Sequence, residues 1–146
     1  MNEYERMLAY LKILYHNFEI LHRHLSGCES WFGTHEQIGE WYEDAGNQVD
    51  DLAETGIALG YKEPSIADAV LAFNGDVIPV IDRGSRESLM ICLEGMRSIA
   101  GLMNAARPIV PPDVQSQIDQ YVYHWNKEGN YKIAAALGRG REYDDD

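Results

Sequence analysis

Cysteine is scarce in this chain, and long apolar runs are absent. The two cysteines, Cys28 and Cys92, lie far apart in the sequence and do not form the paired motif of a zinc site. Two cysteines are also too few for a scaffold held together by disulfides, and we therefore expect a reducing compartment. No run reaches the roughly 18 consecutive apolar residues that a membrane span needs, and the first residues lack the basic and apolar regions of a signal peptide. We therefore expect a cytoplasmic protein with no membrane partner.

Basic residues are also few. The 12 Lys and Arg stand against 24 Asp and Glu, which gives a net charge of −12. Such a surface repels phosphate backbones, so we expect no stable binding to DNA. A negative surface attracts cations. The alternative is that the charge only keeps the protein soluble. With 146 residues, 45% of them hydrophobic, the chain is long enough for one globular domain with a substantial core.

Apolar residues recur at the spacing of an amphipathic helix in four long segments and one short segment. Turn residues separate the segments: Gly27 follows the first, Gly60 follows the second, and Pro108 ends the third long one. Thr34 is a favourable N-cap for the second helix. No segment predicts a strand that could pair with another. The predicted helices cover about residues 3–26, 34–59, 66–73, 85–107 and 111–137.

Two helical hairpins joined by a longer connection predict an all-α fold. A four-helix bundle with one long crossover is the ferritin-like arrangement. Here the crossover between the second and third long helices would carry the short extra helix. An up-down-up-down bundle without metal is the alternative. We expect the bundle to span residues 1–138, followed by a polar C-terminal tail over 139–146.

Histidine is concentrated in the first hairpin, which holds four of the five histidines between residues 16 and 35. His22 lies on the apolar stripe of the first helix, and His35 opens the second. In an antiparallel hairpin, residue 22 lies opposite residues 35–39, so these two side chains should approach each other. Imidazole combined with carboxylate suits iron, zinc or manganese. A polar pair at a hairpin end, without metal, is the alternative. The histidines without an assigned role are His16, His24 and His124.

Two carboxylates follow on the second helix. Asp50 and Glu54 are four residues apart and share one helix face with His35. At about 1.5 Å per residue, however, His35 and Asp50 are roughly 22 Å apart and cannot bind the same ion within one chain. A two-fold axis near residues 42–46 would bring His35 of one chain toward Asp50 and Glu54 of the other, at two identical sites. A solvated acidic face is the alternative.

The hairpin resembles that of the Dps proteins, the mini-ferritins of bacteria and archaea. In that family a His on the first helix stands five residues before a Gly, as His22 does before Gly27. A His at the start of the second helix is followed by an Asp and a Glu fifteen and nineteen residues later, as His35 is followed by Asp50 and Glu54. The end of the second helix is also similar, and the order of elements matches along nearly the whole chain.

The resemblance implies a hollow dodecamer assembled from two-fold dimers. At each two-fold interface, iron(II) would bind His22 and His35 of one chain with Asp50 and Glu54 of the other. The iron would be oxidised at this ferroxidase site, by hydrogen peroxide in preference to oxygen, and the ferric product stored as a mineral. Carboxylate ligands stabilise iron(III) over iron(II), which suits this chemistry.

Some positions differ from the family pattern. Gly39 stands where the family usually has a carboxylate, with Glu40 beside it, and Arg23 replaces a Trp that often follows the first His. Glu19 and Glu40 are candidate accessory ligands, and a second alignment puts Glu19 in the position of His22. Two alternative functions follow from these differences. One is a ferritin-like assembly without ferroxidase activity, and the other is a small dimeric bundle that binds zinc or manganese.

Overall fold

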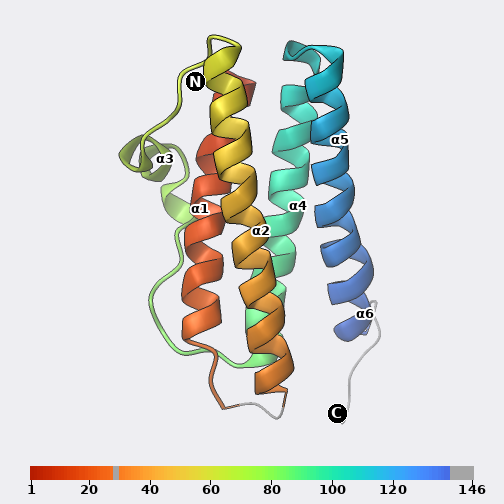
Figure 1. The fold of residues 1–146 in the computed structure, drawn as a ribbon. Coiled ribbons are helices and arrows are strands. Elements are labelled where there is room, and N and C mark those ends of the chain that lie inside the picture. Colours follow the sequence, from red (N-terminus) through yellow and green to blue (C-terminus); the bar gives the residue numbers. More distant parts are fainter. Residues whose placement is uncertain (28–29, 139–146) are drawn as a thin grey trace.

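The computed structural model describes residues 1–27 and 30–138, which form a four-helix bundle (Figure 1). Cys28 and the predicted polar tail, 139–146, lie outside the described residues. One antiparallel hairpin precedes the crossover and a second follows it, and a 3-10 turn, η2 (Arg107–Ile109), joins the last two long helices. The long helices are α1 (Glu3–Arg23), α2 (Trp31–Ala58), α4 (Ser85–Ala106) and α5 (Pro112–Asn126).

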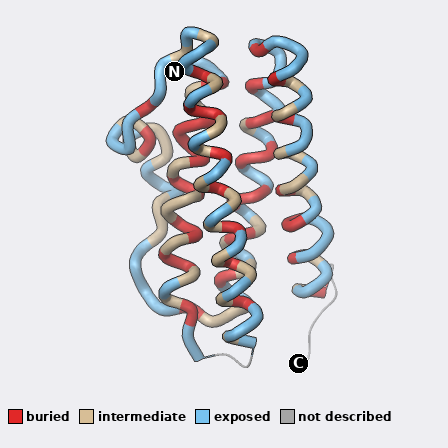
Figure 2. The backbone as a smooth tube through the Cα atoms, in the orientation of Figure 1, coloured by how far each residue is buried: buried red, intermediate tan, exposed pale blue. Residues whose placement is uncertain are grey.

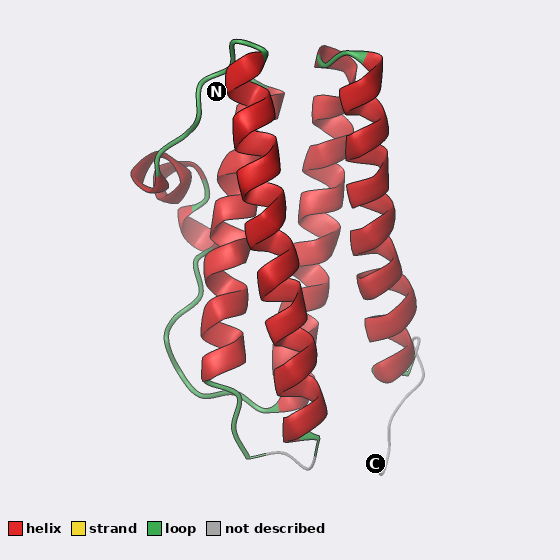
Figure 3. Ribbon diagram, in the orientation of Figure 1, coloured by secondary structure: helices red, strands yellow, loops and turns green. Residues whose placement is uncertain are grey.

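The connection between α2 and α4 runs back along the bundle, so these two helices point in the same direction (Figure 1). It carries the predicted short helix, α3 (Ile66–Ala72), and a 3-10 turn, η1 (Asn74–Asp76). Ala69 of α3 packs against Ala9 and Ile13 of α1. Figure 3 shows helices and loops without a strand in the described ranges. None of these helices combines the length and the hydropathy of a membrane span.

The core follows the bundle axis between the four long helices (Figure 2). Phe18 of α1 is fully buried in it, with its ring centroid 6.4 Å from that of Trp41 and 5.8 Å from that of Trp125. Both tryptophans are buried. Tyr42 and Tyr121, which share the helical spacing of these tryptophans, are only half-buried.

The end of α1 differs from the prediction. The helix stops at Arg23 rather than near residue 26, because the chain there pairs with the segment before α4. The Ser26 N–H donates to the Arg83 carbonyl at 2.9 Å, and the Arg83 N–H donates to the His24 carbonyl at 3.1 Å. These hydrogen bonds join residues far apart in the sequence, so no local pattern announces them.

The start of α2 also differs, since the helix begins at Trp31 and Thr34 is not its N-cap. The Thr34 N–H donates to the Ser30 carbonyl at 2.9 Å, which is the bond of a helical turn already formed. Its side chain faces the next hairpin instead, where the Ser85 hydroxyl donates to Thr34 Oγ1 at 3.1 Å. Thr34 therefore ties α2 to the start of α4.

The last predicted helix, 111–137, changes type along its length. Part of it is a π-helix, in which hydrogen bonds join residues five apart. Such segments are rare in proteins and frequent at functional sites. Gly129 in this segment packs against α4, where a Cβ would lie 3.2 Å from Met96 Cβ. After α5, the chain continues as a π-helical segment, η3 (Lys127–Ile133), and a last turn, α6 (Ala134–Ala136).

The π-helical segment places one carboxylate in the core. Glu128 is buried, accepts a hydrogen bond from Trp41 Nε1 at 3.0 Å and pairs with Lys132 Nζ at 2.8 Å. Burial opposes the charged form, but the bonds from Lys132 and Trp41 outweigh it and lower the pKa of Glu128. The carboxylate is therefore a charged, fully partnered group between α2 and η3.

Gly95 and Gly101 on α4 provide a matched test of core packing. A Cβ at Gly95 would lie 2.5 Å from Leu14 Cδ1, whereas one at Gly101 would meet no atom within 4 Å. Gly101→Ala should raise the free energy of unfolding by up to about 1 kcal/mol through helix propensity. Gly95→Ala should lower it by about 1–2 kcal/mol, because Leu14 must leave its place. Urea denaturation measures both, and equal effects would contradict the packing described here.

Candidate metal centre

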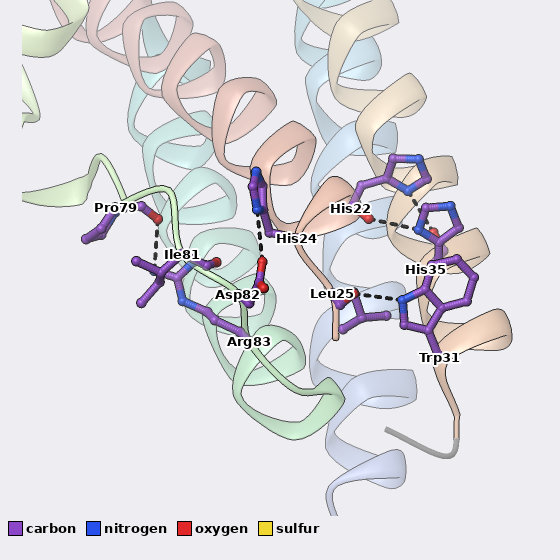
Figure 4. A network of polar contacts seen from close by, with 9 residues as sticks. All are labelled: His22, His24, Leu25, Trp31, His35, Pro79, Ile81, Asp82 and Arg83. Atoms are coloured by element: carbon purple, nitrogen blue, oxygen red, sulfur yellow. Dashed lines mark hydrogen bonds and ion pairs between the residues drawn. The ribbon is translucent and has the colours of Figure 1, made fainter. Parts of the chain in front are cut away.

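His22, near the end of α1, and His35, near the start of α2, lie against each other (Figure 4). Their rings are stacked, with centroids 3.9 Å apart and planes 15° apart. His22 Nδ1 lies 2.8 Å from the His35 carbonyl oxygen, and His35 Nδ1 lies 2.8 Å from the His22 carbonyl oxygen. The expectation that these two side chains approach each other is confirmed.

The reciprocal pairing determines where each ring carries its proton. A carbonyl oxygen only accepts, so both Nδ1 atoms of His22 and His35 donate. In the neutral rings each Nε2 then presents a lone pair, and within residues 1–27 and 30–138 neither Nε2 forms a hydrogen bond. Histidine binds metals in this form, with one ring nitrogen held by a backbone carbonyl and the other free.

Trp31 supports the pair from the face of His35 that His22 does not cover (Figure 4). The indole is stacked on His35 at 4.3 Å, and its Nε1–H donates to the Leu25 carbonyl at 2.7 Å. Leu25 in turn pairs with Arg83 as an isolated parallel bridge. The three stacked rings therefore rest on a hairpin end that is tied to the segment before α4.

Gly39 lies beneath the His22 ring. A Cβ at this position would be 2.8 Å from His22 Cε1 and 3.1 Å from His22 Nδ1. From the sequence, Gly39 is a position where a carboxylate is missing. In the structure, the imidazole of His22 fills the space that a side chain would occupy.

Asp50 and Glu54 lie on the exposed face of α2, away from the histidine pair of the same chain. The α2 helix is uninterrupted between His35 and Asp50, so these fifteen residues span about 22 Å. In the part of the chain that the structure describes, no group of three or more His, Cys, Asp or Glu side chains is arranged to hold a metal ion. One chain therefore brings together only His22 and His35 of the four proposed ligands.

Glu19, the candidate accessory ligand on α1, already has partners. Its Oε2 lies 3.0 Å from Arg23 Nη2 and accepts a hydrogen bond from the Tyr42 hydroxyl at 3.3 Å. The Tyr42 ring is stacked on Tyr15 with centroids 4.8 Å apart. The hydrogen bond with Tyr15 and partial burial raise the pKa of Tyr42 to about 12, so Tyr42 stays a neutral donor toward Glu19.

The other side chains considered from the sequence are engaged elsewhere. Glu40 is exposed and accepts a hydrogen bond from Gln37 Nε2 at 3.1 Å. His124, for which the sequence offers no carboxylate at helical spacing, lies with Nε2 3.0 Å from Asp44 Oδ2. This partner was missed because it comes from α2, while His124 belongs to α5.

Comparison with solved structures identifies the architecture. The chain is similar to the Dps protein of Vibrio cholerae O1, with a TM-score of 0.79 and 20% identity over 92% of this chain and 86% of that one. That protein is described as a member of a broad superfamily of ferritin-like diiron-carboxylate proteins. This chain is also similar to Dps from Staphylococcus aureus, with a TM-score of 0.69 and 14% identity over 97% of this chain and 94% of that one. This chain has the Dps fold.

The Dps fold confirms the predicted ferritin-like four-helix bundle with a short helix in the crossover, and it excludes the up-down-up-down alternative. No protein-family model and no curated protein matches the sequence. The resemblance to the Dps proteins is therefore confirmed at the level of the fold, and the roles of His22, His35, Asp50 and Glu54 stay predictions.

Trp31→Phe tests whether the indole holds the hairpin end of this Dps fold. The variant keeps a ring that can stack on His35 but loses the N–H, which leaves the Leu25 carbonyl without its donor. We expect the free energy of unfolding to fall by about 1 kcal/mol and amide exchange in the first turn of α2 to accelerate. Tyr123→Phe, at a side chain that is 61% exposed on α5, is the control and should change neither. Unaltered exchange in Trp31→Phe would argue against this role.

Proposed function

We propose that this protein is a Dps-like ferroxidase, which binds iron(II) at sites shared between two chains, oxidises it and stores the ferric product in a hollow shell. The observation that carries the proposal is the His22–His35 pair, whose two Nε2 atoms are available to a metal ion. The Dps fold supports it, because it gives this chain the architecture of a ferritin-like diiron-carboxylate protein.

The exposed face of α2 supplies the missing ligands when two chains meet. A two-fold axis near the middle of α2 lays the helices of two chains antiparallel. An axis that brings His35 level with Glu54 of the second chain also brings Gly39 level with its Asp50. Both carboxylates thus reach the end of α2 where the histidine pair lies, and each interface forms two identical sites.

Two large apolar side chains on the same face favour this arrangement. Phe32 is 81% exposed and Ile57 is 60% exposed, although both are apolar. The axis that aligns His35 with Glu54 also aligns Phe32 with Ile57 of the second chain. Burying these side chains would contribute roughly 1.5–3 kcal/mol each to the association of the two chains.

The combined donor set suits iron as a substrate. Two imidazoles and two carboxylates bind iron(II), and the carboxylates favour the iron(III) product. Hydrogen peroxide takes one electron from each of two iron(II) ions and two protons from solvent, and it leaves as two waters. Because peroxide receives both electrons and is reduced to water, no hydroxyl radical is formed, and the iron(III) is retained in the shell. The net charge of −12 draws cations toward the protein.

The same charge argues against DNA as a partner. We place the protein in the cytoplasm as a homo-oligomer, in which two-fold dimers assemble into a dodecamer around the mineral. Its partners are metal ions and further copies of this chain.

Iron oxidation tests the function directly. The protein is loaded with iron(II) without oxygen and then receives a pulse of hydrogen peroxide, while ultraviolet absorbance reports the ferric product. His35→Ala and Asp50→Ala should each slow oxidation by about tenfold or more, because each removes a ligand from every site. Glu94→Ala, which removes an exposed carboxylate from α4, is the control and should oxidise iron at the parent rate.

Mixing His35→Ala with Asp50→Ala chains under subunit exchange should restore part of the activity, since some interfaces then contain one intact site. If the parent oxidised iron no faster than buffer, the protein would be a ferritin-like assembly without ferroxidase activity.

The oligomeric state tests the α2 face separately. The parent should sediment as an assembly much larger than the 16.6 kDa chain. Ile57→Arg should dissociate it, because each interface would then bury two guanidinium groups in place of the apolar contact between Ile57 and Phe32 of the second chain. Gln120→Arg is the control, since this side chain is polar and exposed on α5, and it should leave the assembly intact. A parent that sediments as a dimer would instead support the small metal-binding bundle.

A further inference from the structure

Gly39 has no role in the site as described so far, yet it touches one of its ligands. We propose that Gly39 is the positioning residue of this centre: its missing side chain provides the seat that holds His22 in its metal-binding orientation, and the centre consequently takes one metal ion per chain. This inference rests on the proposed function for its metal, but the seat itself is a property of the metal-free protein.

Two groups from α2 lie close to the His22 ring. A Cβ at Gly39 would lie 2.8 Å from Cε1 and 3.1 Å from Nδ1 of His22. Both are closer than van der Waals contact allows. The His35 ring is stacked on the same imidazole, with centroids 3.9 Å apart, and the His35 carbonyl holds His22 Nδ1 at 2.8 Å. The imidazole cannot move away from a new Cβ without breaking the stack and this hydrogen bond.

A ring of α1 lies over a glycine of α2 at a second position, where the ring is not a metal ligand. Tyr15 lies over Gly46, where a Cβ would be 2.8 Å from Cε1 of Tyr15. That ring ends in a hydroxyl which is hydrogen-bonded to Tyr42. Only at Gly39 does the seated ring carry a free coordinating nitrogen. Gly46 therefore serves packing, and Gly39 serves packing and ligand orientation together.

The seat also limits the number of ions. A carboxylate at position 39 would add oxygen ligands for a second ion, and the His22 ring occupies the place of its Cβ. Glu19 is paired with Arg23, and Glu40 accepts from Gln37. Among the described residues no third ligand side chain joins the histidine pair, so the centre offers two imidazole nitrogens, which with the carboxylates of a second chain complete the shell of one ion.

Substitution of Gly39 by Asp distinguishes this proposal from the alternative that Gly39 marks a lost metal ligand. If Gly39 were a lost ligand, Gly39→Asp would restore a second ion and tighten binding. If Gly39 is a seat, Gly39→Asp and Gly39→Ala both displace His22 and weaken binding. We use Co²⁺ as the probe, titrated into the assembled protein, with visible absorption reporting coordination and equilibrium dialysis reporting stoichiometry.

We expect one Co²⁺ per chain in the parent and a dissociation constant raised about tenfold or more in both Gly39 variants. Gly33→Ala is the matched control on α2, because a Cβ there meets no atom within 4 Å, and it should bind as the parent does. Two ions per chain in Gly39→Asp, or an unchanged dissociation constant in Gly39→Ala, would overturn the proposal.

A double-mutant cycle distinguishes positioning from general damage. In a His22→Ala background no ring lies over position 39, so adding Gly39→Ala should no longer change Co²⁺ affinity. Equal weakening in both backgrounds would overturn the proposal. This background also relieves the clash, which keeps the test valid if Gly39→Ala alone does not fold.

The metal-free protein gives a readout that does not depend on the proposed function. Imidazole ¹H–¹⁵N spectra of the parent should show both His22 and His35 as Nδ1–H tautomers. Gly39→Ala should remove the hydrogen-bonded Nδ1–H signal of His22, and Gly33→Ala should retain it. If the parent binds no Co²⁺ but shows these signals, the proposed function fails and the seat stands. If the signals survive in Gly39→Ala, the seat fails.

Discussion

The close approach of α1 and α2 is the constraint on which the rest of the structure depends. Rings from α1 lie directly on the backbone of α2 at three of its four glycines, which lets the two helices approach each other closely along their shared length. The reciprocal hydrogen bonds between His22 and His35 exist only at this separation. The register of the bundle and the candidate metal centre are thus set by the same interface. The contacts are His22 on Gly39, Tyr15 on Gly46 and Tyr4 on Gly56.

Much of this architecture could be predicted from periodicity alone. Apolar spacing located every long helix, and antiparallel geometry placed residue 22 opposite residues 35–39, where the structure has it. The distance along α2 also showed that His35 and Asp50 cannot share an ion within one chain. These inferences succeeded because they depend on the rise and the twist of a helix, which hardly vary with context.

The misses share a physical cause, which is that tertiary contacts leave no local pattern. The end of α1 is decided by Arg83, about sixty residues away, and Thr34 bonds to Ser85 instead of capping its own helix. Gly39 was interpreted as the absence of a carboxylate, since a sequence does not show which ring fills a gap. The π-helical segment left no such signal, because Trp125, Gly129 and Ile133 recur at the spacing of an ordinary α-helix.

The unbroken course of α2 has a consequence for insertions and deletions. His35 and Glu54 stand on one continuous helix, so the number of residues between them works as a ruler for the proposed shared site. One added residue would turn the far end by about 100° and shift it by about 1.5 Å. Every chain carries both the histidine pair and the carboxylates of the shared site. One inserted residue would therefore misalign both sites of each two-fold pair. Length changes are therefore far less tolerable in this segment than in the crossover, where α3 is linked to its neighbours by loops.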